Sequence, residues 1–243
     1  MDAYLVVTLS FFAVALLYAI VGHAGGSGYI AVMVLAGMTL TSIRPTSLSL
    51  NILVSAIATV QFVRAGHFNL RIFLPFMLGS IPLAWLGGML ELPSTPFKIL
   101  LGIALLFSAW RLLGKRIAPD HYRPMPLLPA IFAGAAIGLF SGLLGIGGGI
   151  FLTPLLLLMG WAAPRQAAAV SAPFILLNSV FALIGLGMHH DIVLPEHFAI
   201  YAAAVIAGGS MGAFLGSRRL QSRTIVLVLS AVLLIAGGKM LYV

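Results

Sequence analysis

The chain has 243 residues, of which 61% are hydrophobic and 7% charged, and its mean hydropathy is +1.15. Soluble domains carry about 25% charged residues, so this composition excludes a soluble globular class. The net charge of +8 is better explained by Lys and Arg in membrane-flanking loops than by nucleic-acid binding. We therefore predict one all-α integral membrane domain, with the lipid bilayer as its surroundings and no nucleic-acid partner.

The N-terminal segment has the hydropathy of a signal peptide, but it lacks a positive region before its apolar run. We expect it to be a retained transmembrane helix. A full span needs about 20 apolar residues, and most of the predicted segments reach that length. In chain order, the predicted segments are 3–22, 28–40, 46–64, 70–90, 96–113, 126–141, 149–160, 165–187, 196–216 and 223–242.

Segments 28–40 and 149–160 are too short to cross a bilayer. Each follows a glycine-rich stretch, "GHAGGSGY" at 22–29 and "GLLGIGGGI" at 142–150. We expect a helix break at each stretch, followed by a short returning helix. The glycines of the two stretches align at a separation of 120 positions, which pairs Gly22, Gly25 and Gly28 with Gly142, Gly145 and Gly148.

The order and type of the elements repeat in the second part of the chain, which indicates two homologous halves. At the same separation, Asn51 falls opposite Ser171 and Ala58 opposite Asn178. Close helix packing is the expected role of the later matching glycines, Gly79 with Gly208 and Gly87 with Gly216. The predicted units are a first transmembrane repeat at 1–113, a basic cytoplasmic linker at 114–123 and a second transmembrane repeat at 124–243.

Lys and Arg gather in the loops on one side of the predicted topology, ten against three on the other side. Because positive loops stay in the cytoplasm, this bias places the linker inside and both termini outside. The first half then runs from outside to inside, and the second half runs from inside to outside. The two halves are therefore predicted to be inverted repeats. Inverted repeats with interrupted helices are a common plan of secondary transporters, and the interruption marks the substrate site.

A helix broken at membrane depth exposes backbone groups that protein, water or substrate must satisfy. The short helices begin just after the glycines, so their N–H groups and positive dipole ends face the breaks and favour an anion. Close packing is the alternative role for these glycines. The sequence predicts a small anionic substrate, and the predicted substrate-binding residues are Gly25, Gly26, Ser27, Gly28, Gly147, Gly148, Gly149, Asn51, Ser171 and Asn178.

His23 lies beside the first break, and an ionisable group inside a membrane is a functional candidate. We predict it as a candidate for proton coupling, with a structural role as the alternative explanation. Sodium held by unwound carbonyl groups is the other coupling ion that fits. No metal site and no cofactor are expected, because the acidic and histidine cluster at 189–197 matches no tight ligand motif.

Four stretches together resemble the TauE/SafE sulfite exporter family: "GLLGIGGGIFLTPLLL", the weaker "GHAGGSGYIAVMVL", "APRQAAAVSAPFILLNSVFALIG" and "GGSMGAFLGSRRL". The likeness covers nearly the whole chain, although His23 and Ser27 replace an apolar residue and a glycine of the usual pattern. The resemblance implies a multi-pass permease of a prokaryotic plasma membrane that moves sulfite or related sulfonates. The transport direction and the coupling ion stay open, and a homo-oligomer is compatible with the sequence.

Two other functions fit parts of the sequence. "GGSG" at 25–28 matches the nucleophile motif of rhomboid-type intramembrane proteases, with Ser27 attacking and a histidine as base. A protease gives no role to the second glycine-rich break, so we expect a protein that is not an enzyme. The third function is an anion channel built from the same hairpins.

Overall fold

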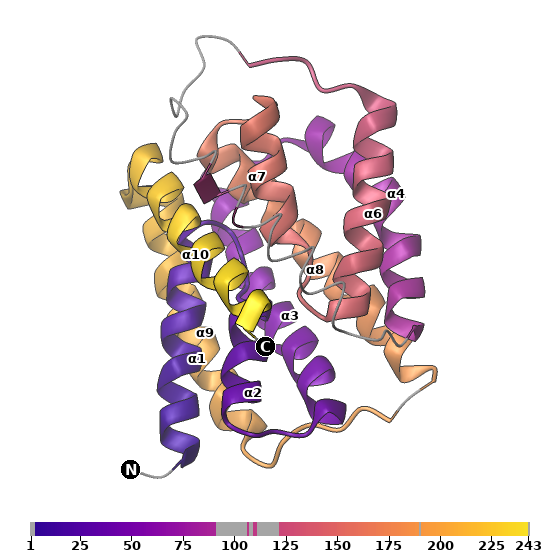
Figure 1. The fold of residues 1–243 in the computed structure, drawn as a ribbon. Coiled ribbons are helices and arrows are strands. Elements are labelled where there is room, and N and C mark those ends of the chain that lie inside the picture. Colours follow the sequence, from indigo (N-terminus) through magenta and orange to yellow (C-terminus); the bar gives the residue numbers. More distant parts are fainter. Residues whose placement is uncertain (1–2, 91–105, 107–108, 111–121, 190, 243) are drawn as a thin grey trace.

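The computed structural model describes residues 3–90, 106, 109–110, 122–189 and 191–242. Most of the predicted segment 96–113 and of the linker 114–123 lies outside these residues. The described part of the chain is helical, without strands (Figure 1). Its elements are α1 (Ala3–Ile20), α2 (Gly26–Leu35), α3 (Leu40–Arg64), α4 (Leu70–Met89), α6 (Leu127–Leu144), α7 (Gly149–Met159), α8 (Pro164–Gly187), α9 (Phe198–Phe214), the π-helical turn η1 (Leu215–Arg219) and α10 (Ser222–Tyr242).

Five helices in the described part of the chain are long and apolar enough to cross a membrane. Large apolar side chains are exposed on their outer faces, for example Leu78 on α4 and Phe132 on α6, as a bilayer-facing surface requires. The prediction of two short helices is confirmed, because α2 has 10 residues and α7 has 11. At 1.5 Å per residue, each covers about half of the hydrocarbon core.

Helix α3 begins earlier than the predicted segment 46–64. Its N-cap is Thr39, and Pro45 lies within the helix instead of preceding it. A proline near a helix start removes one backbone hydrogen bond without ending the helix. The extra residues bring Arg44, which contacts the site described below, into the membrane-spanning bundle.

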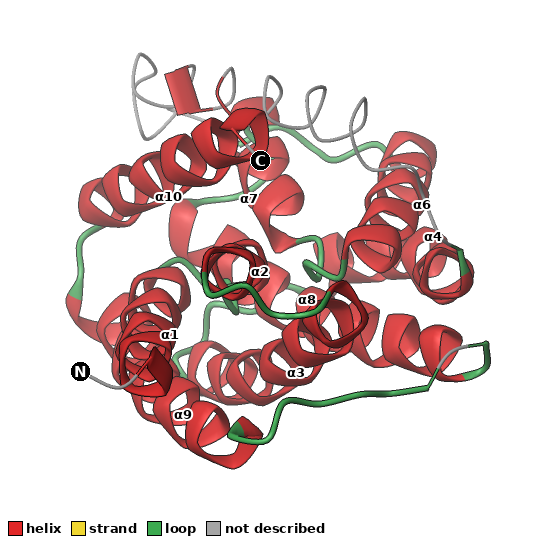
Figure 2. Cartoon of the chain, turned by 60° about the horizontal axis from the view of Figure 1, so that its bottom comes forward, coloured by secondary structure: helices red, strands yellow, loops and turns green. Residues whose placement is uncertain are grey.

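The helices form two outer pairs, with α1 against α9 and α4 against α6, while α3 and α8 pack against each other between them. Figure 2 shows α2 near the middle of this arrangement. Glycines make the outer pairs close: a Cβ on Gly79 would lie 2.1 Å from the Ile131 carbonyl oxygen, and one on Gly208 would lie 2.3 Å from that of Phe12. The predicted packing role of these glycines is confirmed.

The two short helices run in opposite directions. In Figure 1, α2 returns toward the end of the molecule where α1 begins, and α7 returns toward the other end, where α6 begins. Both start near mid-height, so their N-terminal ends and the preceding glycine-rich breaks meet inside the bundle. This meeting point is the centre of the candidate site.

Candidate functional site

The break before each short helix is built on glycines in the left-handed region. Gly25 is the N-cap of α2 with φ 114°, and Gly148 is the N-cap of α7 with φ 83°. Only glycine adopts these angles without strain. Because both N-caps are glycines, no capping side chain accepts a hydrogen bond from the first backbone N–H groups of α2 and α7.

The left-handed glycines correspond at a separation of 123 positions, which differs from the predicted 120. Gly28 was predicted to match Gly148, but it lies inside α2 against the side chains of Val14 and Tyr18 and has no positive φ. The sequence shows where glycines occur but not which of them has a positive φ. For this reason the predicted separation of 120 differs by three residues from the separation of 123 in the structure. The corresponding pairs are Gly22 with Gly145, Gly25 with Gly148, and Gly37 with Gly160. The φ angles within the first and third pairs agree closely.

The long helices α3 and α8 correspond when counted from their N-caps, Thr39 and Ala163. This count pairs residues differently from the prediction, which placed Asn51 opposite Ser171 and Ala58 opposite Asn178. The corresponding positions along the two helices are Ser47 with Ser171, Asn51 with Ile175, and Ser55 with Ser179. The two serine pairs support the new register, in which Asn51 stands opposite Ile175 and Asn178 stands opposite Val54.

The two breaks touch each other. A Cβ on Gly26 would lie 2.9 Å from Cα of Ile146, and a Cβ on Gly149 would lie 3.3 Å from Cδ2 of His23. The Ser47 hydroxyl donates to the Gly145 carbonyl at 2.7 Å and lies 3.3 Å from the Gly26 carbonyl. Sequence reasoning missed Ser47, although its position one helical turn before Asn51 could have indicated it.

Asn51 lies between the two breaks. It is completely buried, and neither Oδ1 nor Nδ2 has a hydrogen-bond partner among the described residues. Its Nδ2 would lie 2.5 Å from a Cβ on Gly26 and 3.2 Å from one on Gly147. A buried amide without partners costs about 1–3 kcal/mol, so its retention at this point indicates a ligand or water.

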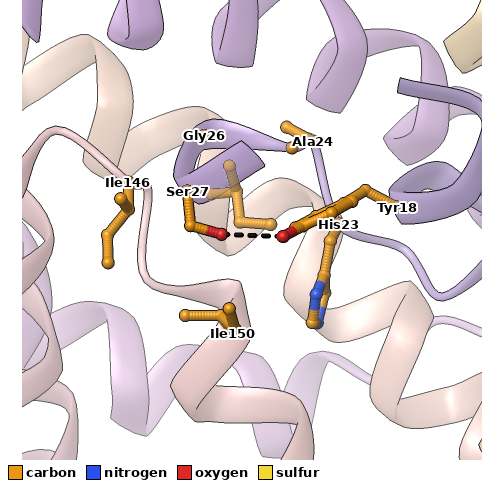
Figure 3. Close-up of a pocket in the computed structure, with 9 residues that line it drawn as sticks. Tyr18, His23, Ala24, Gly26, Ser27, Ile146 and Ile150 are labelled. Atoms are coloured by element: carbon orange, nitrogen blue, oxygen red, sulfur yellow. Dashed lines mark hydrogen bonds between the residues drawn. The ribbon is translucent and has the colours of Figure 1, made fainter. Parts of the chain in front are cut away.

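A small cavity opens beside the first break (Figure 3). Its volume of about 10 Å³ is room for about one water molecule. The hydroxyl groups of Tyr18 and Ser27 are hydrogen-bonded at 2.9 Å within it. The described residues that line it are Tyr18, His23, Ala24, Gly25, Gly26, Ser27, Ile146, Ile150 and Ile175.

His23 is buried and connects the cavity to the second half. Its Nε2 lies 2.8 Å from the Thr153 hydroxyl on α7, and that hydroxyl lies 2.7 Å from the hydroxyl of Ser171 on α8. Nδ1 of His23 has no hydrogen-bond partner in the described structure. Sequence reasoning missed Thr153, although it is the single polar side chain of α7.

The hydrogen bonds of Ser27 and His23 bear on the protease alternative. A serine nucleophile needs a base within hydrogen-bond reach of its hydroxyl. The recorded partner of Ser27 is Tyr18, while His23 bonds to Thr153. The structure does not bring Ser27 and a histidine together as a catalytic pair, which argues against that alternative.

Three predicted residues face away from the cavity. Oδ1 of Asn178 accepts a hydrogen bond from the Ser80 hydroxyl on α4. Gly148 faces side chains of α6 and α8, and Gly28 faces α1. The predicted Ser171 contributes through the Thr153 contact, and Gly149 lies beside His23.

Arg44 lies at the edge of the second break. Its guanidinium donates to carbonyl groups at the C-terminal ends of two helices, Gly88 of α4 at 2.9 Å and Gly142 of α6 at 2.7 Å. A cation is stabilised there by the negative ends of the helix dipoles. Its aliphatic part is also close to the break, since Cγ would lie 2.9 Å from a Cβ on Gly145.

Apolar spanning helices around two short helices and a buried polar centre define a multi-pass membrane protein. The chain belongs to the sulfite exporter TauE/SafE family, whose profile matches residues 7–240. It is 40% identical over 239 residues to the probable membrane transporter protein y4hK of Sinorhizobium fredii, covering 96% of each chain. It is 26% identical over 221 residues to the probable membrane transporter protein YunE of Bacillus subtilis, covering 81% of this chain and 79% of the relative. No solved structure gives a significant match.

These relatives are transporters by name, which fits the expectation that the protein is not an enzyme. The family membership confirms the resemblance stated from the glycine-rich stretches. Because the matched region includes both breaks, the candidate site lies within the part of the chain that defines the family.

Proposed function

We propose that the protein is a secondary transporter of small sulfur-containing anions, such as sulfite or organosulfonates, and that it binds them at the paired breaks. One observation carries the proposal: the N-terminal ends of α2 and α7 meet around the buried amide of Asn51, which has no hydrogen-bond partner among the described residues. Free N–H groups and positive dipole ends attract anions. Nδ2 of Asn51 adds a donor, and none of the described residues that line the cavity is acidic.

Alternating access between inverted halves is part of the same proposal. It is supported by the corresponding left-handed glycines, by the equivalent outer pairs α1–α9 and α4–α6, and by the opposite directions of α2 and α7. A sulfite ion is larger than the water-sized cavity. The anion therefore enters only when the halves move apart, and the conformation described above corresponds to a closed site.

We also propose a membrane location, an orientation of the chain and a coupling ion. The charge bias of the loops supports both termini outside. The membrane transporter relatives from Sinorhizobium fredii and Bacillus subtilis support a location in a prokaryotic plasma membrane. The contacts from His23 through Thr153 to Ser171 support His23 as the proton-coupling residue, because they link the cavity to α7 and α8. A proton carried with the anion would reduce the charge moved across the membrane.

The test is anion counterflow in proteoliposomes. Vesicles preloaded with unlabelled sulfite, or in a second arm ethanesulfonate, receive the labelled anion outside. Gly148→Leu changes a break glycine next to Ile137 and Phe174, whereas Gly160→Leu changes a left-handed glycine with open space around it. We expect saturable accumulation in wild type and in Gly160→Leu, with loss in Gly148→Leu.

Other outcomes separate the alternatives. Flux without counterflow or saturation indicates a channel. Labelling of Ser27 by a fluorophosphonate probe indicates a serine nucleophile and overturns the transporter proposal. Absence of transport for every anion tested, in well-folded protein, overturns the anion assignment.

A further inference from the structure

The cavity at the breaks has a polar side and an apolar side, and each comes from one half of the chain. Tyr18, His23 and Ser27 from the first half carry hydrogen-bonding groups. The second half contributes Ile146, Ile150 and Ile175, which we call the isoleucine wall. Figure 3 shows Ile146 and Ile150 around the space that the Tyr18 and Ser27 hydroxyl groups face.

The two sides occupy corresponding positions. The separation of 123 that pairs the left-handed glycines also pairs His23 with Ile146 and Ser27 with Ile150. The count from the caps of α3 and α8 pairs Asn51 with Ile175. At each of these positions the first half has a polar side chain and the second half has an isoleucine, so the backbone repeats while the chemistry changes from polar to apolar.

This difference favours some anions over others. An inorganic oxyanion carries hydrogen-bond acceptors on most of its surface. Placing it against three isoleucines leaves some of those oxygens without donors, which costs free energy. An anion with a short aliphatic group avoids this cost, because its charged head faces the polar side and its carbon chain covers the wall. Isoleucine has a stiff branched side chain, so the wall keeps its shape.

We propose that Ile146, Ile150 and Ile175 determine specificity and select an organic anion with a short aliphatic group over an inorganic oxyanion. This inference rests on the proposed anion site. The head group that the polar side recognises is a sulfonate or a carboxylate, which share a delocalised negative charge and several acceptor oxygens. The carbon chain is short because the wall consists of only three side chains.

The test compares sulfite with two series of organic anions, and within each series the members differ only in the length of the carbon chain. Dissociation constants are measured by calorimetry on the detergent-solubilised full chain. The ligands are sulfite, methanesulfonate, ethanesulfonate and propanesulfonate, with acetate, propionate and butyrate as a second series. Burying one CH₂ group favours binding by about fourfold, so each added carbon should lower the dissociation constant by about that factor. The series that binds more tightly identifies the head group.

Two substitutions test the wall itself. Ile175→Asn copies the residue of the first half, and we expect it to remove most of the gain per carbon and to strengthen sulfite binding. Ile175→Val removes one methylene and serves if the first variant does not fold; it should weaken propanesulfonate about fourfold and leave methanesulfonate unchanged. The matched control is Ile184→Val on the same helix, where the side chain is 50% exposed, and this change should alter neither.

The outcomes separate this inference from the proposed function. If sulfite binds as tightly as every organic anion, or if affinity falls along the series, the wall does not select the substrate and only this inference fails. If no anion of any kind binds or shows counterflow, the proposed anion site fails as well. If affinity rises along a series and the Ile175 variants reduce the rise, the inference holds.

Discussion

The first and second breaks share a backbone plan and differ in their side chains. Both turn on left-handed glycines, and both lead into helices of about three turns. The first break presents Ser27 and His23 to the cavity, whereas the second presents Ile146 and Ile150. The comparison teaches that glycines determine where the chain reverses, while the residues beside them determine whether the cavity wall is polar or apolar.

A second contrast separates two uses of glycine. At the outer pairs, glycines such as Gly79 and Gly208 lie within regular helices and let two backbones approach. At the breaks, Gly25 and Gly148 are needed for their backbone angles.

The largest loss of stability is expected at a glycine that both adopts a left-handed backbone angle and lets two backbones approach closely. Gly22 has φ 74°, and a Cβ there would lie 2.3 Å from the Ala168 carbonyl oxygen. Gly22→Ala should lower the free energy of unfolding by about 2–5 kcal/mol, from left-handed strain and backbone overlap together. Gly37→Ala is the matched control, because Gly37 has φ 70° and open space around it, so about 1–2 kcal/mol of strain is expected. Equal losses in mixed-micelle unfolding would contradict the close contact between the first break and α8.

The next effect tests the equivalence of the outer pairs. Gly79→Ala and Gly208→Ala both place a Cβ against a carbonyl oxygen of the partner helix. We expect similar losses of about 1–3 kcal/mol from each. Gly238→Ala in α10, where nothing lies within 4 Å, should be neutral or stabilise by up to about 1 kcal/mol. A large difference between the first two variants would show that the outer pairs are not equivalent.

The third prediction compares Asn51, whose amide is proposed to bind the anion, with Asn178, whose amide accepts a hydrogen bond from Ser80. Asn51 has no hydrogen-bond partner among the described residues, so Asn51→Leu removes a buried unsatisfied amide and should raise the unfolding free energy by about 1–3 kcal/mol while it abolishes counterflow. Asn178→Leu leaves the buried Ser80 hydroxyl without its acceptor and should cost about 1–3 kcal/mol. Unfolding and counterflow are measured on both variants. Retained counterflow in a folded Asn51→Leu variant would remove Asn51 from the site.

The smallest expected effect is on the coupling of anion transport to a pH gradient. Thr153 bonds to both His23 and Ser171 but does not line the cavity. Thr153→Val should cost about 1 kcal/mol and reduce anion uptake driven by a pH gradient, while counterflow without a gradient continues. The conservative Thr153→Ser keeps the hydroxyl and should restore pH-driven uptake. If both variants respond to the gradient as wild type does, Thr153 does not position a coupling histidine.

Much of the fold could be predicted from the sequence, because long apolar runs bounded by glycine, proline and charge indicate membrane helices. The predicted segment 70–90 differs from α4 by one residue, and 149–160 differs from α7 by one residue. Two glycine-rich stretches before short apolar segments were enough to predict the breaks. The predicted segment 46–64 begins later than α3, which starts at Leu40 and continues through Pro45.

The site was harder to predict because it depends on backbone angles and on contacts between distant helices. Glycine identity paired Gly28 with Gly148, whereas the glycines with positive φ pair Gly25 with Gly148. The pairing of Asn51 with Ile175 depends on where α3 and α8 begin, which the glycine pattern does not indicate. The role of Thr153 depends on its contact with His23, 130 positions away, which no local pattern indicates.

The most direct measurement of the central claim uses the absence of cysteine from the chain. Ser27→Cys places a single thiol in the cavity, and Met188→Cys, at a position that is 61% exposed, serves as the control. The labelling rates by a small thiol reagent are compared with and without a saturating concentration of a transported anion. The account predicts that the anion slows labelling of Ser27→Cys alone, with half-protection at the concentration that gives half-maximal counterflow. Labelling of Ser27→Cys at the same rate with and without the anion would contradict binding at the paired breaks.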